Sequence, residues 1–385
     1  MKYMLIAGEA SGDLHASRLM AEIIKRDPEA EFCYIGGDLM EKVSSREPAI
    51  HYRELNVMGF SEVVRKLPSL FSSMRKAVKL LDSFKPDTLI LIDYPSFNLR
   101  IAKAAYKKGI RTDWYISPKV WAWKAWRIKK IKKYISFMYS ILPFEPDFYH
   151  KYGFERIKYV GNPSVEETDH SLGHLPPLRH FIERNGLKED KPIIALLPGS
   201  RKGEIRCNLP IMIEAAKQFK DHNIVIAAAP SIPEKFYREV ALDPGLSVVF
   251  GSTAALLKYS VAALVTSGTA TLETALIGTP QVVCYRSNGS RLTYNVMRKL
   301  IKVNYVSLPN LIAGNAIVPE LLLHECTVTN VARELSPLLH NSPDKDWQMQ
   351  GYKFMRRKLG NSVAPAYAAE LIVASLLQAA GREVK

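Results

Sequence analysis

The strongest constraint on the fold is the alternation of short apolar runs with amphipathic segments, which occurs in two separate blocks. Helical patterns in the first block include Leu14–Lys25, Ser61–Phe84 with a break expected near Pro68, and Asn98–Lys107. Between them lie apolar runs of strand length: Tyr3–Ala7, Glu31–Ile35, Asp87–Ile92, Arg111–Ile116, Phe137–Leu142 and Ile157–Val160. This order is typical of a doubly wound parallel α/β sheet.

A polar stretch from Asn162 to Pro192 interrupts the pattern without a convincing strand, so we predict a linker with a short helix there and a domain boundary near Pro163. The alternation then restarts, and the chain is mostly helical after Tyr305. The strands expected in this second block are Ile193–Leu197, Ile224–Ala228, Ser247–Phe250, Ala262–Thr266 and Gln281–Tyr285.

The sequence therefore predicts two Rossmann-like parallel-sheet domains that face a cleft, with a helical C-terminal tail. We place the first domain at residues 1–163 and the second at 164–350. The tail, residues 351–385, is expected to pack on the first domain or on a partner subunit, so the oligomeric state stays open and a homodimer is one alternative.

Composition is that of a cytoplasmic globular protein. Of the 385 residues, 47% are hydrophobic, and the four cysteines are far apart in the sequence without zinc-ligand spacing. No secretory signal is visible, and the most apolar stretch, Val363 to Ala380, is interrupted by polar residues. We expect that stretch to be a core-packing helix.

The formal net charge is +15, from 53 Lys and Arg against 38 Asp and Glu. An excess of this size favours an anionic partner: nucleic acid, an anionic membrane surface or a phosphorylated substrate. A basic but functionally neutral surface is the alternative.

Four loops follow predicted strands, where open parallel sheets bind ligands. They are Gly8–Asp13, Ile92–Asn98, Leu196–Ile205 and Thr266–Ala275. The first has the spacing Gly-x-x-x-Gly-Asp, which is not the dinucleotide-binding G-x-G-x-x-G pattern.

Two of these loops have the features of anion sites. In the fourth, Gly268 allows a tight turn before a helix that begins near Thr269 and Ala270, and Glu273 is placed to bind ribose hydroxyls. The alternative is an ordinary helix capped by Ser267 or Thr269. In the third loop, Gly199, Ser200 and Arg201 combine a guanidinium with backbone donors, which suits a diphosphate.

Asp93 is the leading candidate for acid–base chemistry, because it directly follows an apolar strand. Its alternative role is to cap the loop that follows it. Asp13 and His15 are weaker candidates. The one Asp-x-Asp pair, Asp344 and Asp346, lies at a predicted helix start, so we expect no essential metal and no cofactor.

A basic aromatic stretch, "KVWAWKAWRIKKIKKY" from Lys119 to Tyr134, interleaves three tryptophans with lysine and arginine. Such a mixture suits an anionic membrane interface or nucleic acid. The alternative is a helix whose tryptophans point inward and whose lysines are solvated. The stretch from Val57 to Lys76 is similarly basic and amphipathic.

Taken together, the motifs resemble one family, the lipid A disaccharide synthases. The resemblance is carried by "AGEASGD", "NVMGFSEV", "IDYPSFN", "SPKVWAW", "LLPFE", "LLPGSRKGEI", "SGTATLE" and "YVSLPNLIAG", which follow one another in the family's order between residues 7 and 314.

The resemblance implies an inverting, metal-independent glycosyltransferase of the GT-B type. It would transfer 2,3-diacylglucosamine from its UDP derivative to 2,3-diacylglucosamine 1-phosphate. The product would be a β-1,6-linked tetraacyl disaccharide 1-phosphate, made at the cytoplasmic face of a bacterial inner membrane.

By position, Asp93 matches the family's essential aspartate, and Arg201, Glu273 and Asn310 match residues near UDP. Ser96 stands where many members have a second Asp, which leaves Asp93 as the single carboxylate of this motif. The resemblance also implies that the first loop borders the cleft, with these candidate residues near sugar or acceptor: Gly8, Glu9, Ser11, Asp13 and His15.

Two rival functions come from other classes. A UDP-sugar 2-epimerase would share the architecture but would not need a lipid-facing basic surface. A nucleic-acid-binding protein would account for the charge, but no RNP, helix-turn-helix or zinc pattern supports it, and we expect no nucleic-acid partner.

Overall fold

The structure is a computed structural model that describes residues 1–55, 60–123, 125–243, 245–286 and 305–381. It divides the chain into two compact units. Unit 1 comprises Met1–Pro163 and Asn361–Lys385, and unit 2 comprises Ser164–Gly360. The first division thus follows Pro163. The second division follows Gly360, whereas the C-terminal tail was expected to begin ten residues earlier, at residue 351. The boundary differs because the helix that ends at Leu359 packs within unit 2.

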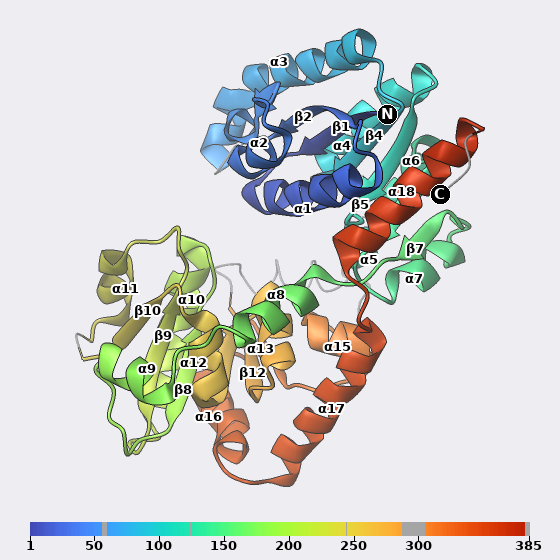
Figure 1. Cartoon of the computed structure of the whole chain (residues 1–385). Coiled ribbons are helices and arrows are strands. Elements are labelled where there is room, and N and C mark those ends of the chain that lie inside the picture. Colours follow the sequence, from blue (N-terminus) through green and yellow to red (C-terminus); the bar gives the residue numbers. More distant parts are fainter. Residues whose placement is uncertain (56–59, 124, 244, 287–304, 382–385) are drawn as a thin grey trace. The chain divides into compact units, whose positions relative to one another are not determined.

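The described part of unit 1 is built on a parallel sheet with the strand order β3-β2-β1-β4-β5-β6-β7 (Figure 1). The central strands are apolar on both faces because helices cover both sides. The strands are β1 (Lys2–Ala7), β2 (Glu31–Gly36), β3 (Ile50–His51), β4 (Thr88–Ile92), β5 (Arg111–Tyr115), β6 (Phe137–Ser140) and β7 (Ile157–Tyr159). The six predicted strands are confirmed, and β3 was missed because two residues carry no periodic pattern.

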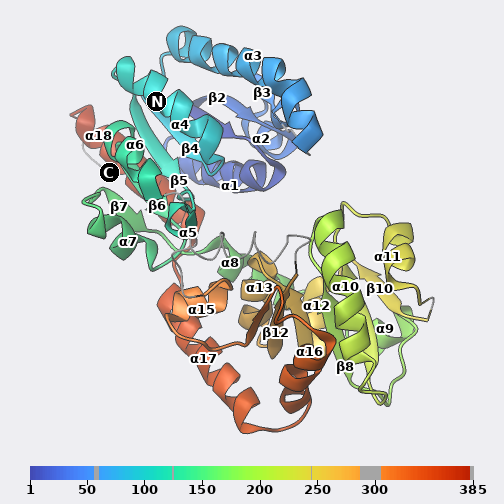
Figure 2. The ribbon, with the colours of Figure 1, turned by 180° about the vertical axis from the view of Figure 1, so that it is seen from behind.

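Helices cover the two faces of this sheet in separate sets. On one face, α3 (Phe60–Phe84), α4 (Pro95–Lys107) and α6 (Ile128–Tyr134) belong to one apolar cluster with β1 and β4. On the other, α1 (Ala10–Arg26) and α18 (Ala364–Ala379) lie side by side, as Figures 1 and 2 show. The shorter helical segments of unit 1 are α2 (Asp38–Ser44), η1 (Tyr52–Glu54), α5 (Val120–Trp123), η2 (Ala125–Arg127) and α7 (Glu145–Lys151).

The predicted break near Pro68 is wrong, because α3 is helical from Phe60 to Phe84. A proline in a helix removes one backbone hydrogen bond, and the rest of this 25-residue helix continues through it. The expected packing of the C-terminal helix is confirmed: α18 buries Ala368, Ile372 and Leu376 in the cluster that contains α1. By length and composition alone, the stretch Pro343–Ala379 would also suffice to span a membrane.

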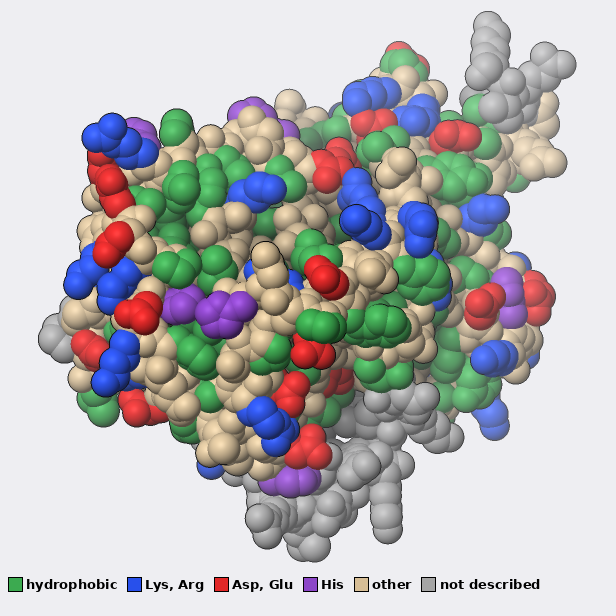
Figure 3. Space-filling model, turned by 90° about the horizontal axis from the view of Figure 1, so that it is seen from below, with side chains coloured by type: hydrophobic (Ala, Val, Ile, Leu, Met, Phe, Trp, Pro, Cys, Tyr) green, Lys and Arg blue, Asp and Glu red, His purple; other side chains and the backbone are tan. Residues whose placement is uncertain are grey.

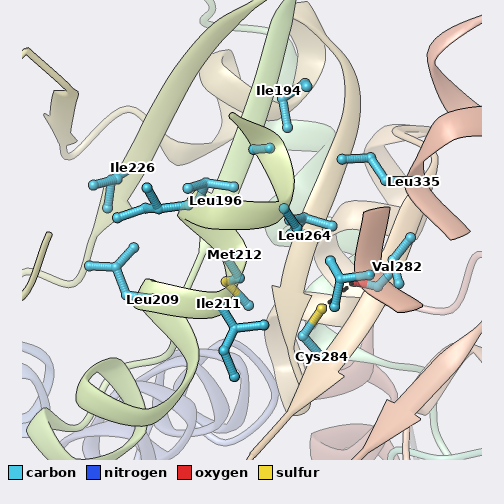
Figure 4. Packing of buried hydrophobic residues seen from close by; sticks show 14 of the residues in the cluster. Ile194, Leu196, Leu209, Ile211, Met212, Ile226, Leu264, Val282, Cys284 and Leu335 are labelled. Carbon is cyan, nitrogen blue, oxygen red and sulfur yellow. Dashed lines mark hydrogen bonds between the residues drawn. The ribbon is translucent and has the colours of Figure 1, made fainter. Parts of the chain in front are cut away.

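Unit 2 has a second parallel sheet, with the order β10-β9-β8-β11-β12-β13 in its described part. Its strands are β8 (Ile193–Leu197), β9 (Asn223–Ala228), β10 (Ser247–Phe250), β11 (Ser260–Thr266), β12 (Gln281–Tyr285) and β13 (Glu320–Leu322). The five predicted strands are confirmed, and the three-residue β13 was missed within a region expected to be helical. Figure 4 shows how α10 (Lys202–Ala216) packs Leu209 and Met212 against strand residues such as Leu196 and Leu264.

The segment expected to hold a linker and one short helix contains two helices, α8 (Pro163–Leu172) and α9 (Leu178–Arg184). The second contributes Phe181 to the apolar cluster on the face of the sheet opposite α10. The other helices of unit 2 are α11 (Glu234–Ala241), α12 (Thr253–Tyr259), α13 (Thr269–Ile277), α15 (Leu308–Ala313), α16 (Val328–Leu335), η3 (Ser336–Leu339) and α17 (Pro343–Leu359).

Each sheet reverses its strand order at one place, which is where open α/β sheets bind ligands. In unit 1 the reversal lies between β1 and β4, with Ala7 beside Ile92 at their carboxyl ends. In unit 2 it lies between β8 and β11, with Leu197 beside Val265. Two of the four candidate loops begin at the reversal in unit 1, and the other two begin at the reversal in unit 2. Each unit therefore brings one pair of these loops together.

Candidate active site

The loop that begins at Asp93 is held in a strained conformation. Asp93 and Tyr94 both adopt left-handed backbone angles, with φ of 40° and 43°, which residues other than glycine rarely do. The side-chain amide of Asn98 donates to the carbonyl oxygens of Ile92 (3.2 Å) and Asp93 (2.7 Å). Pro95 then starts α4, where a proline needs no hydrogen-bond partner. Strain of this kind is concentrated at functional sites.

The opening loop contacts this segment through Gly8. A Cβ atom on Gly8 would lie 2.4 Å from Cδ1 of Tyr94, so only glycine fits at the end of β1. The Tyr94 hydroxyl donates to the carbonyl oxygen of Leu55 at 3.3 Å. The first predicted loop and the Asp93 loop are therefore in direct contact.

Groups that follow three strands affect the pKa of the half-buried Asp93. Burial raises the pKa of its carboxyl above the usual value, Lys119 lowers that pKa, and Glu9 raises it. Lys119 follows β5 after Ile116, another left-handed residue with φ of 64°. Sequence reasoning did not single out Lys119 as a site residue, although its place after a strand in "SPKVWAW" was a usable signal.

The other residues predicted in the opening loop have different surroundings. Asp13 is buried and accepts hydrogen bonds from the backbone N–H of Gly37 (2.7 Å) and Leu39 (3.0 Å), so its carboxylate caps the start of α2. His15 is partly buried, and burial, together with the nearby Arg18, lowers its pKa to about 4. Ser11, like Glu9, is exposed. Asp13 therefore has a structural role, which is to hold the start of α2.

The basic aromatic stretch is divided between the core and the surface. Trp121 is 8% exposed, and its Nε1 donates to Oε1 of the buried Glu145 at 3.0 Å. Trp126 is 60% exposed. The inward-packing alternative therefore holds for Trp121, whereas Trp126 is exposed and its expected contact with a membrane stays a prediction. The side chain of Trp123, residue Lys124, and much of the stretch from Val57 to Lys76 lie outside the described residues.

In unit 2, the loop after β8 turns at Gly199, whose φ is 111°. The backbone N–H of Ser200 donates to Glu204 Oε2 (3.3 Å), and Arg201 is the N-cap residue of α10. Its side chain is 82% exposed, with Nη1 3.0 Å from Oε1 of Glu204. An exposed guanidinium at a helix start can bind an anion.

The loop after β11 places Gly268, with φ of 149°, at the N-cap position of α13. No side chain caps this helix, so the alternative of an ordinary helix capped by Ser267 or Thr269 is wrong. The first turn, with Thr269 and Ala270, presents backbone donors and the positive end of the helix dipole. Glu273 lies half-buried on the next turn, and burial raises its pKa.

Asn310, which the family resemblance places near UDP, has its side chain bonded within unit 2. It is buried, and its side-chain amide donates to the carbonyl oxygen of Val318 (2.9 Å) and to Glu320 Oε1 (2.8 Å). Its Oδ1 accepts from the backbone N–H of Ile317 and Val318. All four hydrogen-bonding positions of the side chain are used, so the side chain of Asn310 holds the segment before β13.

Among the described residues, no group of three or more His, Cys, Asp or Glu side chains is arranged to hold a metal ion. Asp344 and Asp346 lie in the first turn of α17, as the sequence predicted, where negative charge favours the helix dipole. The cap itself is Ser342, whose hydroxyl oxygen accepts from the backbone N–H of Lys345 at 3.2 Å.

Two Rossmann-like units, each with its loops at a reversal of strand order, define an α/β protein with the GT-B type of fold. Solved structures agree on the fold. The UDP-GlcNAc 2-epimerase from Neisseria meningitidis has a TM-score of 0.61 at 14% identity, covering 98% of this chain and 100% of that one. The calicheamicin glycosyltransferase CalG4 has a TM-score of 0.59 at 14% identity, covering 98% of each chain.

The sequence comparisons are more specific. The family model for lipid-A-disaccharide synthetase matches residues 3–372. The lipid-A-disaccharide synthase of Myxococcus xanthus is 38% identical over 378 residues, and that of Geobacter metallireducens is 34% identical over 381, each covering 97% of both chains. The chain belongs to the lipid-A-disaccharide synthase family, which makes it a glycosyltransferase of lipid A biosynthesis.

Proposed function

We propose that this protein transfers 2,3-diacylglucosamine from UDP-2,3-diacylglucosamine to 2,3-diacylglucosamine 1-phosphate. The products are a β-1,6-linked tetraacyl disaccharide 1-phosphate and UDP. Family membership supports this reaction. The observation that carries the mechanism is the strained, half-buried Asp93 at the reversal point of the unit 1 sheet.

In this proposal Asp93 acts as the general base. Its carboxylate takes the proton from the acceptor 6-hydroxyl as the oxygen forms a bond to the anomeric carbon of the donor. The bond from that carbon to the β-phosphate oxygen breaks, and its electron pair leaves with UDP. Attack opposite the leaving group inverts the anomeric configuration.

Unit 2 supplies the groups for the leaving UDP. The uncapped start of α13 at Gly268 and the exposed guanidinium of Arg201 would stabilise the negative charge that develops on the diphosphate. Glu273 is placed one turn into α13, where its carboxylate could accept hydrogen bonds from the ribose hydroxyls. The start of α13 and Arg201 provide positive charge without a metal.

The deciding experiment for this chemistry is product analysis by mass spectrometry with both lipid substrates. Asp93→Ala should abolish disaccharide formation but keep UDP affinity within about twofold, because the donor groups lie in unit 2. Asp147→Ala, which removes an exposed carboxylate from the start of α7, is the matched control and should remain active. Turnover by Asp93→Ala within tenfold of the wild type would exclude Asp93 as the base. Formation of UDP-N-acetylmannosamine from UDP-N-acetylglucosamine would favour the epimerase alternative.

We also propose that the protein works as a peripheral protein at the cytoplasmic face of the inner membrane. Lys129 and Lys133 on α6 are exposed, and neither forms an ion pair within the described part of the chain. Each cation near an anionic surface contributes about 1 kcal/mol. Lys129→Gln with Lys133→Gln should therefore weaken sedimentation with phosphatidylglycerol vesicles while leaving activity in detergent unchanged. Unaltered vesicle binding at low salt would exclude α6 as a membrane contact.

A further inference from the structure

A pocket of about 300 Å³ lies in unit 1 between α4 and the segment formed by η2 and α6. The first helix contributes Arg100 and Lys103 to its lining, and the second segment contributes Arg127 and Lys130. Four cations around one pocket of this size suit a compact anion with several oxygens.

Among the residues that the structure describes, no carboxylate pairs with any of the four cations. From Arg100 to Lys133 the sequence contains twelve Lys and Arg but one acidic residue, Asp113. That carboxylate is buried and paired with Arg111 at 2.8 Å. Within the part of the chain that the structure describes, none of the four pocket cations lies within 4.0 Å of a carboxylate oxygen. Their charge is therefore available to a ligand.

Two of the cations are held in place by their surroundings. Arg127 donates from Nη2 to Oγ of Ser96 at 3.1 Å. The ring of Trp126 lies 5.6 Å from the Arg127 guanidinium and 5.5 Å from the Lys130 ammonium, which is within cation–π range. Preorganised cations lose less entropy on binding an anion.

The pocket begins next to the proposed base. Pro95 and Ser96 line it and follow Asp93 by two and three residues. Because a chain extends by at most about 3.5 Å per residue, the Cα atom of Pro95 lies within about 7 Å of that of Asp93. The end of the pocket lined by Pro95 and Ser96 is therefore close to Asp93 along the chain.

We propose that this pocket binds the phosphomonoester of the acceptor glycolipid, an inference that rests on the proposed function. The acceptor carries its phosphate and its reactive hydroxyl on the same sugar ring, so a phosphate site must lie within one ring's length of the base. The apolar part of the lining, Leu99, Trp126 and Tyr134, suits the rest of an amphiphile. Arg100, Lys103, Arg127 and Lys130 would act as binding residues that orient the acceptor.

The test compares two acceptors in detergent with saturating donor: 2,3-diacylglucosamine 1-phosphate, and the analogue with a methoxy group in place of the phosphate. The full-length variant Arg100→Gln/Lys103→Gln should lower kcat/KM at least tenfold for the phosphorylated acceptor. For the methoxy analogue it should stay within twofold of the wild type. Lys42→Gln/Arg46→Gln, which makes the same charge change at exposed positions elsewhere in unit 1, is the control and should preserve the preference.

Each other outcome overturns the inference. An unchanged preference in the pocket variant excludes the phosphate site, and an equal loss for both acceptors assigns the cations a different role. A loss limited to sedimentation with phosphatidylglycerol vesicles assigns the pocket to bulk lipid headgroups. If the wild-type protein transfers to neither acceptor, the proposed function itself has failed, which is a distinguishable result.

Discussion

The aromatic ring of Tyr94 lies against the backbone of Gly8 so closely that a methyl group on Gly8 would come within 2.4 Å of the ring. This contact joins the end of β1 to the loop that carries Asp93. The two segments are 86 residues apart in sequence, and the pairing of β1 with β4 brings them together. The packing of the candidate catalytic loop therefore requires a glycine at position 8.

The first prediction follows from that contact. Gly8→Ala should lower kcat by at least tenfold, because the new methyl group displaces Tyr94 and with it Asp93. The double variant Gly8→Ala/Tyr94→Ala, measured in the same assay, should regain part of the loss. Gly173→Ala, where the nearest atom to the added Cβ would be 3.5 Å away, is the control. Full activity in Gly8→Ala would show that Tyr94 moves without disturbing Asp93.

The second prediction concerns the acidic limb of the pH profile. A base must be ionised, so kcat/KM falls as the pH drops through the Asp93 pKa. Lys119 lowers this pKa and Glu9 raises it. Lys119→Met should therefore move the acidic limb to higher pH, and Glu9→Gln should move it to lower pH. Shifts in the same direction would contradict the assignment of this limb to Asp93.

The third prediction concerns Glu145, whose pKa burial raises to about 7. A carboxyl whose folded-state pKa exceeds its unfolded value stabilises the fold at low pH, and this stability is lost as the pH rises through the folded pKa. The difference from the usual glutamate pKa of 4.5 corresponds to roughly 3 kcal/mol of stability, which is lost as the pH rises from about 4.5 to 7. Measured by Tm against pH, Glu145→Gln should have a flatter slope than the wild type over this window. Parallel slopes would show that Glu145 does not titrate there.

The fourth prediction tests the donor site in unit 2. Arg201→Ala should weaken UDP binding about tenfold in calorimetry, in line with the loss of one charge-assisted hydrogen bond. Arg179→Ala is a close control, because Arg179 is also 82% exposed and also pairs with a glutamate on its own helix. Equal affinities of the two variants would remove Arg201 from the diphosphate site.

The fifth prediction concerns metal dependence. Because Asp344 and Asp346 belong to the first turn of α17, replacing both by Asn should cost stability of about 1 kcal/mol or less and leave turnover unchanged. Treatment with EDTA should also leave turnover unchanged. Inhibition by EDTA that magnesium reverses would refute this expectation.

Sequence alone determined the strands, the fold class and the loops that carry the candidate site. A parallel strand buried on both faces must be a continuous apolar run, so β1, β4, β8 and β11 were recognisable from local composition. Because ligands bind at the carboxyl ends of such strands, the loops at Asp93, Gly199 and Gly268 followed directly. Elements of two or three residues, β3 and β13, are too short for any period and were missed.

Only the tertiary structure decided which of these ends are neighbours. Strand order places Gly8 against Tyr94 and brings Lys119 near enough to Asp93 to affect its pKa, and no local pattern encodes either relationship. Long-range contacts likewise bury the side chain of Asn310. They also bury Trp121, whereas Trp126 remains exposed. Local periodicity reports which face of an element is apolar, whereas the partners of a polar side chain depend on segments that meet only when the chain has folded.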